Sequence, residues 1–311
     1  MDDQALFKSY QQKPLVAVPT VILAFACVSV FYANIVLGIQ GLIPLWFGCL
    51  VNCIAGYLLF SPIHDSLHRS VSSNHKFNEF IALLTVNGLT PYASVKLFRF
   101  MHMQHHRFTN EEDKDPDAFA GKGGWRIWSL WFFWDALYLV KYWQMRHERP
   151  QDEVKSVIIG LSIGLPITVA LFYAFPLEIF FLWFIPNRMT VWLICYIFMY
   201  LPHQPHSIEQ KTAPFHATLI RTGWDKLLDP VLMYQNYHLV HHLYPTIPFY
   251  LYKKAWFALE EYHTSQQPAT VSAFQLKPDP ERLQQGINHY LSEKIEPTDE
   301  QLAEQKLVAG L

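Results

Sequence analysis

The dominant pattern in the sequence is a pair of long apolar stretches that are each too long for a single membrane span. Residues 14–63 contain no Lys, Arg, Asp or Glu, and a second apolar block covers residues 157–201. About 20 residues cross a bilayer core of about 30 Å, so each stretch can hold two spans. Turn residues at 38–41 and 175–178 divide them. The pattern therefore predicts four transmembrane helices arranged as two hairpins.

The expected boundaries follow from these breaks. We expect the first hairpin at 14–62, with spans at about 15–37 and 42–62 and with Pro62 ending the second span. We expect the second hairpin at 156–202, with the fourth span at about 180–201. The other segments are polar or mixed: a leader at 1–13, a middle segment at 63–155, a segment at 203–265 and a charged, Gln-rich peripheral tail at 266–311. This organisation predicts an all-α integral membrane protein with a helical cap.

The basic residues predict the orientation. Segment 64–155 is rich in Lys and Arg, whereas the two short turns contain neither. By the positive-inside rule, the leader, the middle segment and the C-terminal part are cytoplasmic, in a bacterial inner membrane or its equivalent. Both termini then lie on the cytoplasmic side. Within the middle segment, Trp125–Trp143 is rich in aromatic residues and basic at both ends, which suits either an interfacial helix or a packed helix of the cap.

Composition narrows the class of protein. Charged residues make up 16% of the chain, against about 25% in soluble domains. The net charge of −2 gives no reason to expect a nucleic-acid partner. All four cysteines lie in apolar runs, so we expect reduced, inert thiols. The N-terminus is acidic and shows no secretory signal, so the first apolar segment is expected to stay in the mature protein.

Three short segments repeat histidine at helical spacing. Eight of the fifteen histidines fall in these boxes, which are His64 and His68, then His102, His105 and His106, then His238, His241 and His242. Offsets of three and four residues place side chains on one face of a helix. All three boxes also fall on the same predicted side of the membrane, so the active site is expected on the cytoplasmic side.

A metal centre explains this pattern better than structural histidines do. A lone histidine is usually a hydrogen-bonded structural residue, but three boxes on one face predict metal ligation. Imidazole suits Fe, Zn, Cu and Ni. The chain lacks the pair of Glu-x-x-His motifs that a ferritin-type site needs and has no Cys-x-x-Cys motif, which argues against ferritin-type and thiolate sites. Eight imidazoles exceed the needs of one ion, so two ions are expected. Redox chemistry favours iron, and the spacing alone leaves zinc open.

With these boxes, the chain resembles the membrane fatty acid desaturase/hydroxylase superfamily, whose signature is HxxxH, HxxHH and HxxHH. The resemblance covers about residues 45–260. Within the superfamily, the segments 105–117, 200–205 and 235–250 are most similar to cyanobacterial-type β-carotene 3-hydroxylases. The superfamily usually recruits one further histidine from the end of the fourth span, and His203 stands at that position.

The resemblance implies a di-iron centre with O2 as co-substrate and no catalytic residue beyond the metal centre. The implied ligands are His64, His68, His102, His105, His106, His203, His238, His241 and His242. Ligating imidazoles normally donate their other N–H to a carboxylate or carbonyl. The nearest polar residues that could orient the rings are Asp65, Asp115, Asp117 and Asn236. His206 is expected at the rim, and the remaining five histidines are expected to be structural or solvated.

The expected reaction is hydroxylation of an unactivated C–H bond in a lipophilic substrate. The resemblance favours the β-ionone ring of a carotenoid, and the alternative is desaturation or hydroxylation of a lipid acyl chain. Box 1 lacks the glycine common in acyl-lipid desaturases, with Ser66 and Leu67 in its middle. The sequence shows no haem-binding box, GxGxxG loop or four-cysteine cluster, so electrons are expected from a ferredoxin-like partner. A metal transporter would need ionisable residues along the spans, which the first two lack. A structural zinc site is the remaining alternative.

Overall fold

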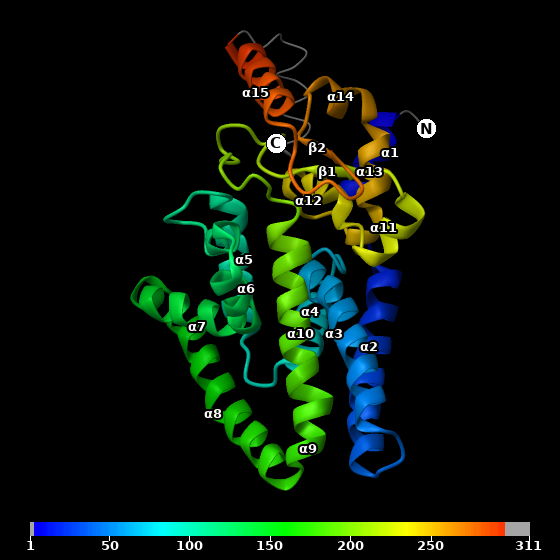
Figure 1. The fold of residues 1–311 in the computed structure, drawn as a ribbon, viewed down its shortest axis with the longest axis vertical. Coiled ribbons are helices and arrows are strands. Elements are labelled where there is room, and N and C mark those ends of the chain that lie inside the picture. Colours follow the sequence, from blue (N-terminus) through cyan, green and yellow to red (C-terminus); the bar gives the residue numbers. More distant parts are fainter. Residues whose placement is uncertain (1–2, 296–311) are drawn as a thin grey trace.

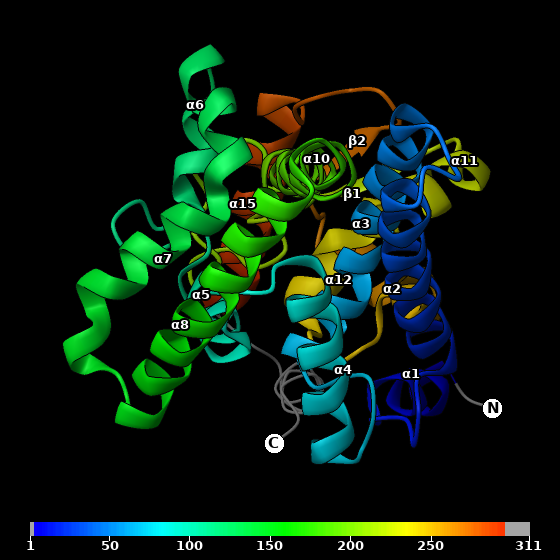
Figure 2. The same cartoon turned by 90° about the horizontal axis from the view of Figure 1, so that it is seen from below.

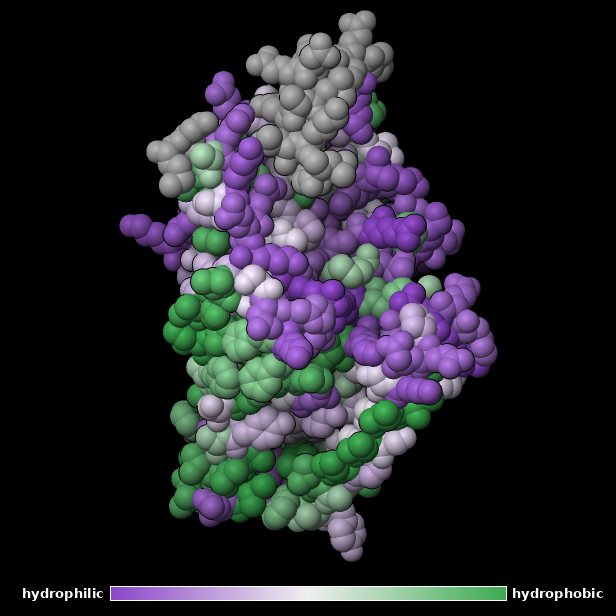
Figure 3. All heavy atoms as spheres, turned by 180° about the vertical axis from the view of Figure 1, so that it is seen from behind, coloured by the Kyte–Doolittle hydropathy of each residue, from purple (hydrophilic) through white to green (hydrophobic). Residues whose placement is uncertain are grey.

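The computed structural model describes residues 3–295, and most of these are helical (Figure 1). Long helices form a lower level, and shorter helices gather above them as a cap. Apolar side chains dominate the surface of the lower level and polar ones that of the cap (Figure 3). Residues 1–2 of the expected leader and 296–311 of the expected tail lie outside the described residues.

Four helices in the described part are long and apolar enough to cross a membrane, in agreement with the predicted number. They are α2 (Val18–Ile39), α3 (Leu45–Leu67), α8 (Gln151–Ala174) and a continuous helix over Pro176–Tyr200. The last consists of α9 (Pro176–Ile179), η4 (Phe180–Phe184), α10 (Ile185–Ile194) and η5 (Cys195–Tyr200), with π-helical geometry in η4 and η5. Packing is closest between α2 and α3, whereas α8 lies on the opposite side of α10 from α2 (Figures 1 and 2).

Two boundaries differ from the expectation. Helix α3 does not end at Pro62 but continues to Leu67, with His68 as its C-cap. Membrane-embedded helices tolerate proline where neighbouring elements pack around it, and Pro62 is buried. Helix α8 begins at Gln151, earlier than its apolar run, because Asp152 and Glu153 stabilise the positive end of the helix dipole. Box 1 is therefore part of a long helix rather than of a loop behind it.

The middle segment folds into several helices, and the loop at residues 90–94 separates the first of them from the others. These are α4 (His75–Leu89), α5 (Val95–Phe108), η1 (Ala118–Lys122), α6 (Trp125–Leu130), η2 (Trp131–Phe133), α7 (Trp134–Met145) and η3 (Arg146–Glu148). Helix α4 packs against α2 and α3. The loop between α4 and α5 reaches down beside α10 (Figure 1, cyan). The expected Trp125–Trp143 helix is divided at η2, and buried Trp131 and Trp134 pack it into the protein core.

A buried ion pair joins the middle segment to the fourth long helix. Both Arg188 Nη atoms donate to the carboxylate of Asp135, at 2.9 and 2.7 Å. The two side chains are 11% and 8% exposed. We expect Asp135→Asn to lower the free energy of unfolding by about 3 kcal/mol, because it leaves a buried guanidinium without a counter-charge. Denaturant unfolding in detergent measures this loss.

A double-variant cycle separates the ion pair from general packing. Adding Arg188→Gln to Asp135→Asn should restore part of the loss, because the unpaired charge is then removed. The comparison variant is Asp152→Asn, which breaks an exposed pair with Lys96 and should leave the unfolding midpoint nearly unchanged. Equal losses in the single and double variants would contradict the assigned role of the pair.

The cap is built from both ends of the chain. Its elements are α1 (Asp3–Gln11), α11 (Asp225–Val231), η6 (Gln235–Tyr237), α12 (His238–Leu243), η7 (Phe249–Leu251), α13 (Tyr252–Ala258), α14 (Glu260–Ser265) and α15 (Pro280–Ile295). Among the described residues, the exception to the helical architecture is a two-stranded parallel sheet of β1 (Ile220–Thr222) and β2 (Thr270–Ser272). Phe7 of α1 is 1% exposed and packs edge-on against Tyr244, which anchors the leader to the cap.

His263 in the cap should make stability depend on pH. Its Nδ1 lies 2.9 Å from the Trp256 carbonyl oxygen, and burial lowers its pKa to about 4. Between about pH 6.5 and 4 the unfolded chain binds a proton that the folded chain excludes, so the free energy of unfolding falls as pH falls. The slope approaches about 1.4 kcal/mol per pH unit for one such group. The difference in unfolding midpoint between the wild type and His263→Gln should therefore shrink as pH falls across this range. A difference that stays constant with pH would contradict the prediction.

Candidate metal centre

Each histidine box lies on a helix, as its spacing predicts. Box 1 occupies the last turn of α3, box 2 lies on α5, and box 3 forms α12. His203 lies three residues after the end of the π-helical segment η5, and π-helical geometry is frequent at functional sites. Four segments far apart in the sequence thus bring their histidines to one place, above the long helices and beneath the cap.

The nine histidines converge through their Nε2 atoms and divide into two groups. In the first group the ligand atoms of His64, His68, His102, His106 and His241 all lie within 4.8 Å of one another. In the second group the same holds for His105, His203 and His242. His238 joins the second group, with its Nε2 3.0 Å from those of both His203 and His242. This arrangement suits two ions.

The distances between these nitrogens match those expected around a metal ion. Two nitrogens bound to one ion at about 2.1 Å and at a right angle are about 3 Å apart. In the first group the Nε2 of His241 lies 3.0 Å from that of His64 and 2.8 Å from that of His106. The corresponding distance between His68 and His102 is 2.7 Å. The spacing therefore fits metal coordination.

Oxygen acceptors behind the rings fix which nitrogen faces inward. Carboxylate and amide oxygens can only accept, so the Nδ1–H groups donate outward and the Nε2 lone pairs point at one another. His105 Nδ1 donates to Asp115 at 2.9 Å, His242 Nδ1 to Gln210 at 2.8 Å and His238 Nδ1 to Gln235 at 2.5 Å. Lone pairs that face each other with no proton between them need a cation, so the residues present fit the implied metal.

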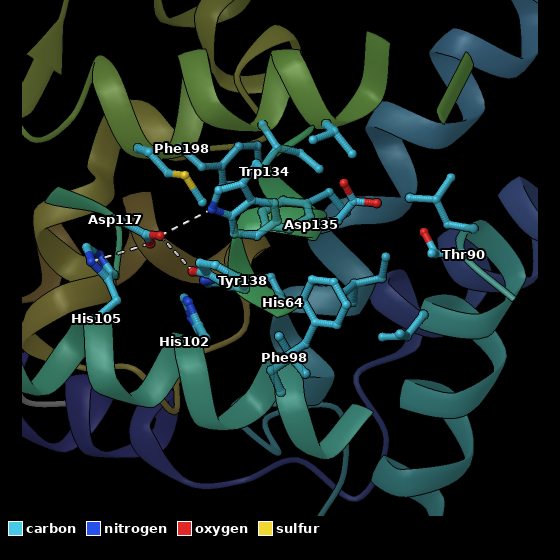
Figure 4. Close-up of a pocket in the computed structure, with 18 of the residues that line it drawn as sticks. His64, Thr90, Phe98, His102, His105, Asp117, Trp134, Asp135, Tyr138 and Phe198 are labelled. Atoms are coloured by element: carbon cyan, nitrogen blue, oxygen red, sulfur yellow. Dashed lines mark hydrogen bonds and ion pairs between the residues drawn. The ribbon is translucent and has the colours of Figure 1, made fainter. Parts of the chain in front are cut away.

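Asp115 and Asp117 lie where the sequence places them, beside His105. Asp115 also accepts the backbone N–H groups of Asn110 and Asp117, both at 2.8 Å, so its carboxylate is fixed from three sides. Asp117 lies 3.5 Å from His105 and accepts the hydroxyl of Tyr138 at 2.7 Å (Figure 4). The two carboxylates form a rigid support behind box 2.

Asp65 and Asn236 do not contact a ring of the cluster. The Asp65 carboxylate accepts the hydroxyl of Thr20 at 2.8 Å and the backbone N–H of Phe249 at 3.1 Å. Asn236 donates to Asp229 at 2.8 Å. Adjacent residues on a helix point in different directions, which explains why proximity in sequence did not place them behind a ring. Both residues instead connect the segments that carry the boxes.

Sequence reasoning missed three residues that support the rings. Gln235 and Gln210 accept from imidazoles, and the hydroxyl of Tyr252 lies 3.0 Å from His241 Nδ1. Gln235 stands three residues before His238, so its helical offset was a usable signal. Gln210 and Tyr252 come from a loop and from the start of α13, and no local pattern marks them.

Burial keeps most of these imidazoles neutral. Burial lowers the pKa of six histidines of the cluster, and neighbouring imidazoles lower it further. These residues are His102, His106, His203, His238, His241 and His242. The pKa of His68 is lowered in the same way. Burial also acts to lower the pKa of His105, but the carboxylates of Asp115 and Asp117 outweigh it and raise the pKa to about 9. Neutral imidazoles are the form that binds metal.

The other histidines lie apart from the cluster. His206 contacts the carbonyl oxygen of Tyr200 at 3.1 Å and sits behind His203, at the rim of the site. The rest bond to backbone, lie near a carboxylate or are exposed, and these are His75, His147, His216, His263 and His289.

A narrow apolar cavity ends at the metal centre. His64, His102, His105 and His238 line one end, and Thr90 and Asp135 lie toward the other (Figure 4). Most of the wall between them is apolar: Phe60, Ile63, Leu67, Val86, Leu89, Phe98, Val191, Ile194, Phe198 and Met199. This cavity can hold a slender hydrocarbon against the nitrogens of both groups.

Comparison with known proteins identifies the family. The family model described as "Fatty acid desaturase" matches residues 40–271, which include every histidine of the cluster. The chain belongs to the fatty acid desaturase family.

Individual desaturases show low identity to this chain. It is 28% identical to the dihydrorhizobitoxine desaturase of Bradyrhizobium elkanii, over 62% of this chain and 61% of that protein. It is 25% identical to the sn-1 oleoyl-lipid 12-desaturase of a Picosynechococcus species, over 81% and 79%. It is also 25% identical to the omega-3 fatty acid desaturase fat-1 of Caenorhabditis elegans, over 63% and 56%. The match thus spans less than two thirds of the first and third relatives. None of the three is named as a carotenoid hydroxylase, and the second and third support the acyl-chain alternative better.

Proposed function

We propose that this desaturase-family protein is a di-iron, O2-dependent enzyme that introduces a double bond into the acyl chain of a membrane lipid. The observation that carries the proposal is the position of the histidine cluster at one end of a narrow apolar cavity. A chain of CH2 groups is the substrate that such a cavity accepts, because its walls offer apolar contact along most of the length.

Bound iron would supply the redox chemistry by which a CH2–CH2 unit, one O2, two electrons and two protons become a CH=CH unit and two waters. His64, His68, His102, His106 and His241 would hold one ion. His105, His203, His238 and His242 would hold the other. All nine residues would bind as neutral nitrogen donors, His105 after it has lost a proton, so the site would be cationic and would attract oxygen-derived anions.

The chain itself contributes orientation and exclusion of water. Asp115, Gln210 and Gln235 hold three of the rings from behind, so the donor set is arranged before metal enters. Phe198 and Trp134 border the cavity beside the cluster, and the apolar wall keeps water from the reacting carbons (Figure 4).

Sidedness and the electron donor are part of the same proposal. The Lys and Arg residues of the segment 64–155 support a cytoplasmic cap, with both termini and the metal centre on that side. A separate ferredoxin-like carrier would then deliver the electrons from the cytoplasm.

Mass spectrometry of total lipids tests the proposal. The protein is produced in aerobic bacteria that accumulate β-carotene, alongside the His241→Ala variant. We expect acyl chains lighter by two hydrogens with the wild type only. A new carotenoid heavier by oxygen, with the acyl chains unchanged, would replace this proposal with ring hydroxylation. That is the reaction of the β-carotene 3-hydroxylases whose motifs this chain resembles. Purified protein that contains zinc and consumes no O2 would support a structural metal site instead.

A further inference from the structure

A second apolar cavity lies next to the first, between α8 on one side and α7 and α10 on the other. Its wall includes Leu97, Val157, Leu161, Phe172 and Trp183. The space open to water-sized molecules is about 460 Å³ here, against about 60 Å³ in the cavity that ends at the metal centre. The larger of the two cavities is therefore the one farther from the histidines.

Helix α8 makes a close approach to the loop between α4 and α5. A Cβ atom at Gly164 would lie 2.4 Å from the Cα of Tyr92, and one at Gly160 would lie 3.0 Å from the Tyr92 carbonyl oxygen. The two glycines thus let the helix touch the backbone of the loop between α4 and α5. Beyond this contact, α8 lies apart from α10 (Figure 1), and only 11% of the most apolar 18-residue stretch of α8 is buried.

The cavity opens on the flank of α8. Leu165 and Val169 line it and are nevertheless 42% and 66% exposed, so they mark its mouth. Both residues lie within one of the four helices suited to cross a membrane. The surroundings at that depth are the hydrocarbon of a bilayer, not water.

The inner end of the second cavity adjoins the first. Thr90, Phe98 and Asp135 line both. The charge of Asp135 is balanced by Arg188, so the junction carries no unpaired charge that would repel a hydrocarbon. The two cavities are therefore neighbours that share part of their walls, one reaching the flank of α8 and the other reaching the histidines.

We propose that the second cavity is a lateral entrance through which the acyl chain of a membrane lipid reaches the metal centre from within the bilayer. The inference rests on the proposed function and adds the route and the membrane-embedded form of the substrate. An acyl chain suits the path because it moves from hydrocarbon into a mostly apolar wall and carries no polar group of its own that must be desolvated. Leu161 and Phe172 are the side chains that it would pass.

Photo-crosslinking tests occupancy without requiring turnover. The full-length protein is reconstituted in nanodiscs that contain a phosphatidylcholine with a diazirine within its acyl chain, irradiated, and mapped by peptide mass spectrometry. We expect adducts at cavity residues such as Leu161 and Phe172. Leu161→Trp, which fills the cavity, should remove them, whereas Ile163→Trp should not, because Ile163 faces outward on the same helix and is 58% exposed. Adducts confined to outward-facing residues would overturn the proposal.

Turnover of membrane lipid tests the route. Leu161→Trp should lower turnover about tenfold, equivalent to about 1.4 kcal/mol, with unchanged iron content, and Ile163→Trp should resemble the wild type. Leu165→Trp at the mouth serves as the second variant if Leu161→Trp does not fold. Cavity adducts with normal turnover in both blocking variants would make the cavity a site for structural lipid and overturn the entrance. Cavity adducts with no wild-type turnover would instead contradict the proposed function and leave lipid binding supported.

Discussion

His241→Ala is expected to reduce product formation to background and to lower bound iron, while the protein still inserts into the membrane. The Nε2 of His241 lies within 3.0 Å of nitrogens from both box 1 and box 2, so its ring is the point at which α3, α5 and α12 meet. Removing it takes a ligand from the centre of the five-histidine group and changes none of the long helices. Iron per protein and desaturated lipid are measured on the same purified samples.

The matched control is His289→Ala. That imidazole contacts the Ser265 carbonyl oxygen and lies near Glu293, far from the cluster in the fold. It should retain the iron content and turnover of the wild type. Full turnover in His241→Ala would remove the basis for assigning iron to the first group.

Asp115→Asn is expected to lower iron affinity by about 10- to 100-fold, the usual cost of removing a carboxylate behind a ligating histidine. The asparagine oxygen can still accept the Nδ1–H of His105, so the ring should stay in place. The negative charge that makes the imidazole a stronger ligand is lost, however. Competition with a coloured chelator measures the iron affinity directly. The unfolding temperature of the iron-free variant should stay close to that of the iron-free wild type.

Asp113→Asn provides the comparison, because it removes a carboxylate two residues away that is exposed and bonds to no histidine. Equal iron affinity in the two variants would show that Asp115 acts only in folding the 109–117 turn. Loss in Asp115→Asn alone would assign it the positioning of His105.

The local parts of the site could be predicted from the sequence. Residues three and four apart lie on the same face of any helix, so the spacing of His102, His105 and His106 predicts a shared face without knowledge of where the helix packs. Asp115 and Asp117 were also found, because a short turn returns the chain to box 2. The four helices suited to cross a membrane followed from long runs with few or no charged residues, which hydrocarbon favours along most of a span.

The parts that depend on packing between distant segments could not be predicted. Gln210 supports His242 across 32 residues, and Tyr252 reaches His241 from a different helix. The end of α3 was misplaced because proline was weighed by its local effect, whereas the surrounding helices decide whether Pro62 is tolerated. The second cavity depends on the contact of Gly164 with Tyr92, about 70 residues apart in the chain, which no periodicity encodes.

The distribution of ligands along the chain sets an order of events during synthesis. The first group of nitrogens needs His64 and His241 together, so it cannot be complete until the chain has left the ribosome as far as His241. By then the four apolar helices have already emerged and can enter the membrane. Iron would therefore be acquired by a chain that is already inserted and folded around an empty donor set. Membrane insertion of the helices would thus come first in folding, and metal binding would come last.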